Sequence, residues 1–185
     1  MKYSNSQRAL RLLVFGALLA AISIVCGKYL AINMGEVLRF SFENLPIIFA
    51  GVAFGPIMGA LVGAVADLVG CLLVGYAINP IVTLGAVSIG LISGVYRFLP
   101  DSDRRSACII KVAVTVILAH LVGSVVIKTF GLAKFYDMPL IVLMLWRLLN
   151  YVIVGALEGF ILYHLIRNKK ISAEIHKIMK RKDRK

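Results

Sequence analysis

The chain has 185 residues, of which 60% are hydrophobic and 16% are charged, and its formal net charge at pH 7 is +12. Apolar residues in this proportion, arranged in long uninterrupted stretches, exclude a water-soluble globular domain and predict an all-α membrane protein. The positive charge does not indicate nucleic-acid binding, because most of the 21 Lys and Arg residues lie next to the apolar stretches.

Most of the basic residues fall in three clusters: an N-terminal patch, a central turn from Arg97 to Lys111, and a tail from Arg167 to Lys185. Cationic residues that flank spanning helices are retained on the cytoplasmic side of a membrane. With all three clusters cytoplasmic, the number of spans on each side of the central turn is even. The sequence therefore predicts a multi-pass protein of the bacterial cell membrane with both termini in the cytoplasm.

Six apolar stretches follow one another along the chain, and a spanning helix needs roughly 20 such residues. They lie at about Leu12–Val25, Leu45–Phe54, Pro56–Leu73, Pro80–Phe98, Ile109–Ile127 and Pro139–Ile166. The second is too short alone, so we expect its helix to begin before Arg39 or to cross obliquely. Phe54-Gly55-Pro56 then forms a tight turn into the third. These stretches predict a six-helix transmembrane domain over residues 1–168.

Residues 169–185 form a basic cytoplasmic tail. Juxtamembrane Lys and Arg clusters are attracted to anionic lipid headgroups, so we expect a helical extension that lies on the bilayer surface.

Several classes of function lack their motifs. The three cysteines, Cys26, Cys71 and Cys108, form no CxxC pair, which argues against a metal site or a disulfide framework. The phosphate-binding motif GxxxxGK[ST] of ATPases and the zinc-binding motif HExxH of metalloproteases are both absent. Ser93 lies deeper in its helix than His120, which argues against an intramembrane serine protease. We expect no enzymatic activity and no cofactor. A stand-alone secondary transporter of a small organic anion remains an alternative.

Small residues recur at four-residue spacing, which marks faces where membrane helices pack closely. The ladder Gly51, Gly55, Gly59 and Gly63, and the pairs on the later helices, are interpreted as internal packing. The first stretch carries Gly16, Ala17, Ala20 and Ala21 and has no polar residue between Leu12 and Ile22. We therefore interpret these four positions as a docking face for a partner protein.

Ionisable residues within a membrane are costly and tend to mark functional sites. Asp67, His120 and Arg147 each lie eight residues from the expected outer end of their stretch, a depth of roughly 12 Å. Together with outer-loop residues they predict an outward-facing cavity for a flat, polar, anionic small molecule. Two alternatives stay open: Asp67 and Arg147 neutralise each other structurally, and His120 is a hydrogen-bonded interior histidine.

One segment resembles a known family. Leu38-Arg-Phe-Ser-Phe-Glu-Asn-Leu-Pro46, Ala50-Gly-Val-Ala-Phe-Gly-Pro56 and Gly59-Ala-Leu-Val-Gly-Ala-Val-Ala-Asp-Leu-Val-Gly70 are similar to the S components of energy-coupling factor (ECF) vitamin transporters, within them most closely to the folate family. The resemblance extends over most of residues 10–166. Asn79-Pro-Ile-Val-Thr-Leu84 keeps Pro80, Thr83 and Leu84 of the corresponding outer loop but lacks its aromatic residues. S components for other vitamins share the fold, so another vitamin remains an alternative.

The resemblance implies an S-component bundle that captures a vitamin outside and delivers it with a transmembrane coupling subunit and two ATPase subunits. It also implies that Ala17 and Ala21 match the Ala-x-x-x-Ala docking motif. For folate, Arg147 is the principal ligand candidate, because an arginine holds a carboxylate through two parallel bonds. The other substrate-binding candidates are Asp67, Asn79, Asn150, Arg39, His120 and Glu43.

Overall fold

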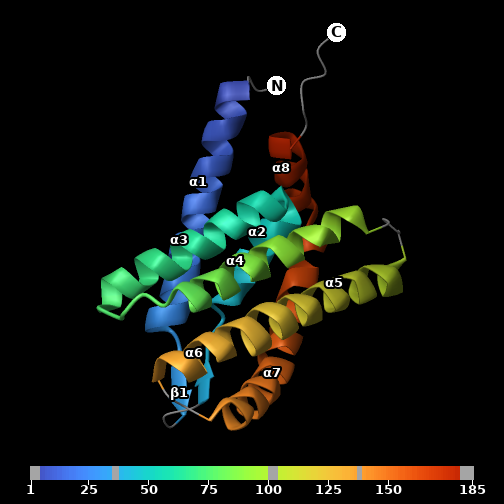
Figure 1. The fold of residues 1–185 in the computed structure, drawn as a ribbon. Helices are drawn as coiled ribbons and strands as arrows, with labels where there is room; N and C mark the ends of the chain where they lie inside the picture. The colour runs from blue at the N-terminus through green and yellow to red at the C-terminus, as the bar shows by residue number, and fades with distance from the viewer. Residues whose placement is uncertain (1–4, 35–37, 100–103, 137–138, 180–185) are drawn as a thin grey trace.

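The computed structural model describes residues 5–34, 38–99, 104–136 and 139–179, and almost all of them are helical (Figure 1). The helices are α1 (Asn5–Ile24), α2 (Asn44–Phe54), α3 (Pro56–Val74), α4 (Pro80–Gly94), α5 (Arg105–Ala119), α6 (Thr129–Tyr136), α7 (Leu140–Arg167) and α8 (Lys169–Met179). Two π-helical segments, η1 (Val25–Tyr29) and η3 (His120–Lys128), extend α1 and α5, and a 3₁₀ turn, η2 (Val95–Phe98), extends α4.

Within the described residues, five helices are long and apolar enough to cross a bilayer. They are Ser6–Tyr29, Pro56–Val74, Pro80–Phe98, Arg105–Phe135 and Leu140–Arg167. The prediction of an all-helical membrane protein is thus confirmed. The second predicted stretch is an 11-residue helix, α2, whose rise of roughly 16 Å is about half of a hydrocarbon core.

The region before α2 differs from the prediction. Its helix does not begin before Arg39, because strands β1 (Ile32–Met34) and β2 (Leu38–Phe40) form an antiparallel hairpin there. Ile32 pairs with Phe40, and Asn33 pairs with Arg39. The fifth predicted stretch also continues further than Ile127, since α6 carries the same helix on to Tyr136.

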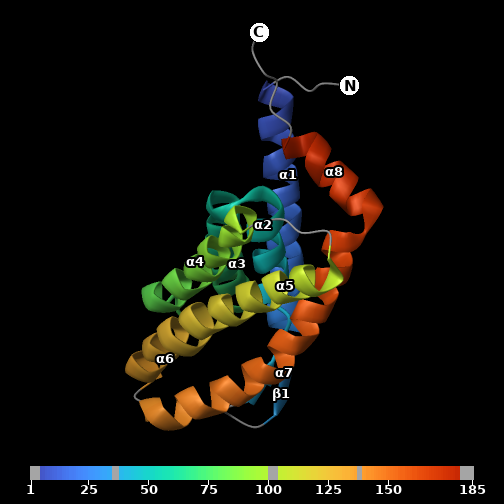
Figure 2. The same ribbon diagram turned by 90° about the vertical axis from the view of Figure 1, so that its right-hand side faces the viewer.

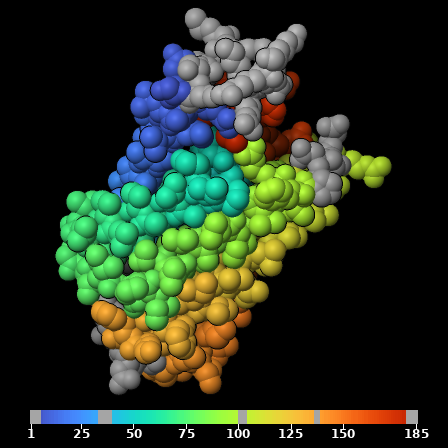
Figure 3. All heavy atoms as spheres, turned by 45° about the horizontal axis from the view of Figure 1, so that its top comes forward, coloured from blue at the N-terminus to red at the C-terminus, as the bar shows by residue number. Residues whose placement is uncertain are grey.

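Glycines bring α2, α3 and α4 into close contact, as the four-residue spacing predicted. A Cβ added at Gly90 would overlap the backbone of Gly59, and one at Gly63 would overlap the carbonyl group of Ala86. Gly55 has φ +100° and joins α2 directly to Pro56, the first residue of α3. In Figure 3, α3 and α4 lie side by side across one face of the molecule, with α5 next to them.

The three basic clusters meet at one end of the molecule. The Arg11 guanidinium on α1 lies 3.6 Å from a Glu174 carboxylate oxygen on α8. Arg97, just after α4, lies 3.9 Å from the Met179 sulfur. Ile178 of α8 is 1% exposed and packs with Phe54 of α2. The hairpin lies at the opposite end of the molecule, where β2 contacts α7 (Figures 1 and 2).

Candidate substrate site

A buried lysine, Lys128, is the centre of a polar cluster near the hairpin end. Only 3% of Lys128 is exposed. Its Nζ donates hydrogen bonds to Glu43 Oε1 at 2.9 Å and to Asn44 Oδ1 at 3.3 Å. The Asn44 amide in turn donates to Ser124 Oγ at 3.4 Å. A buried ammonium without an anionic partner costs several kcal/mol. Lys128 therefore ties the segment before α2 to the segment after α5.

The π-helical segment η3 explains how an apolar helix presents these groups to the interior. Such segments are rare, and many of them occur at functional sites. His120, Ser124 and Lys128 are all buried within it. The Thr129 hydroxyl donates to the Ser124 carbonyl five residues earlier, at 3.2 Å. The widened turns thus keep three polar side chains, spaced four residues apart, on the inner face.

A second cluster joins η3 to α7. His120 Nε2 lies 2.5 Å from Glu158 Oε2, and its Nδ1 lies 3.4 Å from Ser124 Oγ. Glu158 is completely buried. The His120 ring stacks on Tyr151 with 4.7 Å between centroids. Both ring nitrogens are engaged within the protein, so His120 has the geometry of the hydrogen-bonded interior histidine.

Arg147 lies one turn before Tyr151 on α7. One guanidinium nitrogen donates to the Tyr151 hydroxyl at 3.3 Å, and the guanidinium carbon is 5.7 Å from the centroid of that ring. Arg147 Nε is buried and has no hydrogen-bond partner in the described part of the chain. A buried donor left unsatisfied is costly. Arg147 therefore has donor capacity available for a ligand.

Asp67 and Asn79 have partners elsewhere. The Thr83 hydroxyl donates to Asp67 Oδ2 at 2.6 Å, and no ion pair joins Asp67 to Arg147 among the described residues. The Asn79 side chain accepts from the Ile81 amide at 3.0 Å and donates to the Gly131 carbonyl at 2.8 Å. Asn79 Oδ1 thus caps the N-terminus of α4, while Asn79 Nδ2 is bonded to α6, so both ends of the amide are engaged.

A small pocket separates the Lys128 cluster from Asp67. Its volume is about 20 Å³, and it is lined by Ser23, Ile24, Gly27, Lys28, Glu43, Ile47, Ala66, Asp67, Ala86 and Lys128. That space holds about one water molecule. A vitamin-sized ligand does not fit in this space as the structure stands.

Comparisons with known proteins place the chain in a family. The family model described as "ECF transporter, substrate-specific component" matches residues 11–167. The chain belongs to the family of substrate-specific components of ECF transporters. It is therefore a membrane-embedded S component that works with an energising module in transport, and it is not an enzyme.

Two curated relatives and three solved structures are similar to this S component. It is 35% identical over 103 residues to an uncharacterized protein of Mycoplasma pneumoniae, the "MG313 homolog", a match that covers 52% of this chain but only 35% of that protein's length. It is 22% identical to the folate transporter FolT of Clostridium novyi, over 84% of this chain and 88% of that protein.

Among solved structures, FolT bound with folic acid superposes with a TM-score of 0.67 at 25% identity, covering 83% of this chain and 90% of that one. The S component of a bacterial ECF transporter gives 0.66 at 18% identity, covering 90% and 98%. The S component for biotin gives 0.58 at 16% identity, covering 90% and 95%. The last two likenesses show the shared fold.

The remaining candidates fall at different places in the S component. Asn150 is buried on α7, with 7% of it exposed. Arg39 lies in β2, and its side chain is outside the described set. The equal depth expected for His120 assumed a helix end at Lys128, but the helix continues to Tyr136. The structure thus brings Arg147 close to His120 through Tyr151, and it leaves Asp67 in a separate group.

Sequence reasoning missed Lys128 as a site residue, because it stands where an outer helix end was expected. Asn44, Ser124 and Tyr151 were also missed. A partial signal was present, since Glu43 and Asn44 form a polar pair directly before a short apolar helix. Their partner lies some 85 residues away, a separation that residue spacing does not bridge.

The small residues of α1 divide into two faces. Gly16 and Ala20 are buried, and a Cβ added at Gly16 would meet the Met58 side chain of α3 at 2.8 Å. Ala17 and Ala21 are exposed on the other side of the helix. The docking proposal for this S component therefore rests on Ala17 and Ala21, while Gly16 and Ala20 pack against the bundle.

Proposed function

We propose that this S component binds folate or a closely related pterin vitamin and delivers it across the bacterial cell membrane. The observation that carries the proposal is the likeness over most of the chain to FolT bound with folic acid. The folate transporter FolT from Clostridium novyi is similar over 84% of the chain. The cationic groups described above suit a ligand that carries two carboxylates.

Arg147 and Lys128 are the two cations that we assign to the folate carboxylates or the pterin edge. Arg147 has an unused buried donor, Nε, and its guanidinium lies beside the Tyr151 ring. Lys128 is held by Glu43 in this structure. A ligand carboxylate can replace the Glu43 carboxylate on Lys128 at little electrostatic cost, because one anion substitutes for another. We assign Asn150 and Arg39 to the wall of the same site.

We further propose that the three basic clusters lie in the cytoplasm and that the hairpin end faces outward, following the positive-inside rule. The exposed Ala17–Ala21 face would then dock on a transmembrane coupling subunit, which works with two ATPase subunits. The basic segment from Lys169 onward would rest on the inner leaflet.

Binding by the purified protein tests the substrate assignment. Isothermal titration with folate, thiamine, riboflavin and biotin should show saturable binding of folate and at least tenfold weaker binding of the other three. Arg147→Met should weaken folate binding, whereas Lys177→Met, which removes an exposed cation of α8, should leave it unchanged. Preferential binding of another vitamin would keep the family and overturn the folate assignment.

A further inference from the structure

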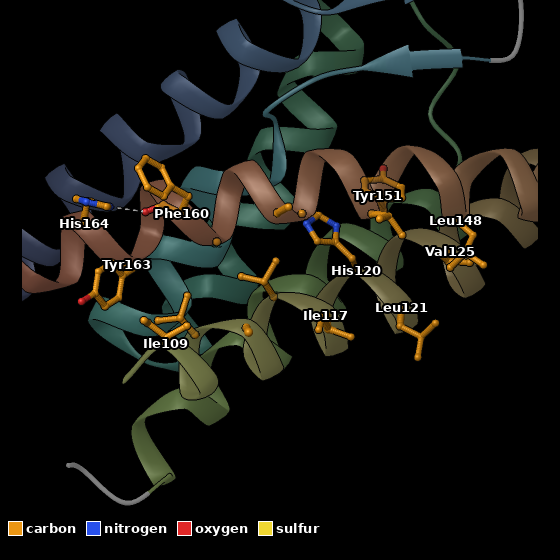
Figure 4. A pocket seen from close by; sticks show the side chains of 17 residues that line it. Ile109, Ile117, His120, Leu121, Val125, Leu148, Tyr151, Phe160, Tyr163 and His164 are labelled. Atoms are coloured by element: carbon orange, nitrogen blue, oxygen red, sulfur yellow. Dashed lines mark hydrogen bonds between the residues drawn. The ribbon is translucent and has the colours of Figure 1, made fainter. Parts of the chain in front are cut away.

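A long apolar groove runs between α5 and α7, and His120 lines it whereas Lys128 does not. The volume of the groove is about 620 Å³, within the range of ~300–1,000 Å³ typical of ligand sites. Figure 4 shows Ile109, Ile117 and Leu121 along one wall and Leu148, Tyr151 and Phe160 along the other. The groove extends from Ile109 and Tyr163 at the end near the basic clusters to Val125 and Leu148.

The groove opens toward the surroundings of the bundle. Ile117, Val152 and Phe160 on its edges are 62%, 64% and 65% exposed. Gly155 and Gly159 lie on its floor, and no atom lies within 4 Å of a Cβ placed on Gly159. Gly159 therefore differs from the glycines of α2 to α4, since it leaves a hollow where the others bring helices together.

A hollow of this kind does not stay empty in a bilayer. Lining atoms without neighbours lose their dispersion contacts, and the almost wholly apolar walls give water few hydrogen-bonding partners. A hydrocarbon chain or an apolar protein surface has to fill it. The charges beside the groove distinguish between these occupants.

Two arginines flank the end of the groove near the basic clusters. Arg105 is one turn before Ile109 on α5, and Arg167 is one turn after Tyr163 on α7. Both are exposed, and neither forms an ion pair within the described ranges. The Arg167 guanidinium lies 5.8 Å from the centre of the Tyr163 ring. The groove thus ends between two available cations.

We propose that this groove is a binding site for an anionic phospholipid, with an acyl chain between α5 and α7 and the headgroup phosphate at Arg105 and Arg167. The part of the groove from Ile109 to Ile117 has a helical rise of ~12 Å, close to the ~15 Å of one hydrocarbon leaflet. A protein partner would fill the apolar part equally well, but it would leave the two cations unexplained. A headgroup phosphate supplies an anionic partner for both arginines.

Native mass spectrometry of the intact protein tests the proposal. The protein is released from vesicles of equal parts phosphatidylglycerol and phosphatidylcholine, and the retained lipid is identified by mass. The wild type should retain phosphatidylglycerol preferentially. Arg105→Gln with Arg167→Gln should lower that preference by about fivefold for each arginine, roughly 25-fold in all. Lys170→Gln, which removes one charge nearby, should lower it by less than twofold.

A second variant tests the groove itself. Gly159→Leu places a side chain in the hollow and should reduce retention of both lipids, with Gly159→Ala intermediate. Unchanged preference in the double arginine variant, or unchanged retention in Gly159→Leu, overturns the proposal. So does a Gly159→Leu variant that retains lipid normally but fails to assemble with the energising module, because the groove is then a protein interface. Loss of folate binding with normal lipid retention would assign the groove to the vitamin and equally overturn the proposal.

Discussion

The α2–α3–α4 half of the molecule and the α5–α7 half are built on different principles. In the first, glycines such as Gly59 and Gly90 bring helix backbones into direct contact, and few polar groups are buried. In the second, a π-helical segment carries buried Ser124 and Lys128 inward, His120 pairs with Glu158, and a groove separates the helices. The same residue type, glycine, closes one half and leaves a hollow in the other.

This difference suggests a division of roles, in which the α2–α3–α4 half supports the fold and the α5–α7 half recognises the ligand. Close backbone packing gives a half that changes shape only with difficulty, because packed cores have few alternative arrangements. The polar side chains that a ligand needs lie in the α5–α7 half and in the segment that carries Glu43, which is bonded to Lys128. We therefore expect substitutions in the first half to affect stability, and substitutions in the second to affect binding.

The largest expected effect is a loss of stability on substitution of Gly90. Gly90→Leu would force a side chain into the backbone of α3, and we expect destabilisation by about 3 kcal/mol or more, measured by thermal unfolding in detergent. Gly159→Leu makes the same chemical change in the open half. It should be neutral or stabilising by up to about 1 kcal/mol, because leucine favours a helix more than glycine does. Equal losses of stability would remove the distinction between the halves.

The next largest expected effect is a loss of stability when the Glu43–Lys128 ion pair is broken. Glu43→Gln leaves a buried ammonium without its anion and should cost up to about 3 kcal/mol of stability. Adding Lys128→Met should recover most of that stability but not the binding of folate. A double variant that binds folate as the wild type does would show that Lys128 has only a structural role.

Arg147 should affect binding more than stability. Arg147→Met, and Arg147→Lys nearly as strongly, should weaken folate binding by roughly 10- to 100-fold, the value of charge-assisted hydrogen bonds. The melting temperature should change little, because no ion pair holds Arg147 in the described structure. A large fall in melting temperature that Asp67→Asn reverses would instead reveal a structural pair with Asp67.

The smallest effect on the isolated protein is expected at the exposed face of α1. Ala17→Trp or Ala21→Trp should leave folate affinity within about twofold, while assembly with the energising module fails because close helix approach is blocked. Ile110→Trp, at an exposed position of α5, is the matched control and should assemble normally. Collapse of folate binding in the α1 variants would assign that face to internal packing.

The sequence predicted features that depend on local pattern. Apolar length located the long helices, Gly55-Pro56 located the turn into α3, and glycine spacing predicted the close packing of α2 to α4. The capping role of Asn79 was not predicted, since Asn79 was interpreted as a ligand residue, although an asparagine directly before a proline is typical of a helix start.

Features that depend on contacts between residues far apart in the sequence could not be predicted from the sequence. The two strands of the hairpin, Ile32–Met34 and Leu38–Phe40, are too short to give a reliable pattern, and this region was expected to be an outer loop that leads into the second helix. The burial of Lys128 depends on Glu43, and the satisfaction of His120 depends on Glu158, 38 residues further along the chain. Only the fold brings these charged residues together. The charge of a residue and its expected depth in the membrane therefore did not distinguish ligand-binding residues from structural ones.

Uptake by vesicles that contain only this protein tests the central claim most directly. A binding subunit that relies on a separate energising module should bind radiolabelled folate at the membrane but accumulate none in the lumen, with or without an ion gradient. Adding the module and ATP should start accumulation. Robust accumulation by this chain alone, without ATP, would contradict the account and identify a stand-alone secondary transporter.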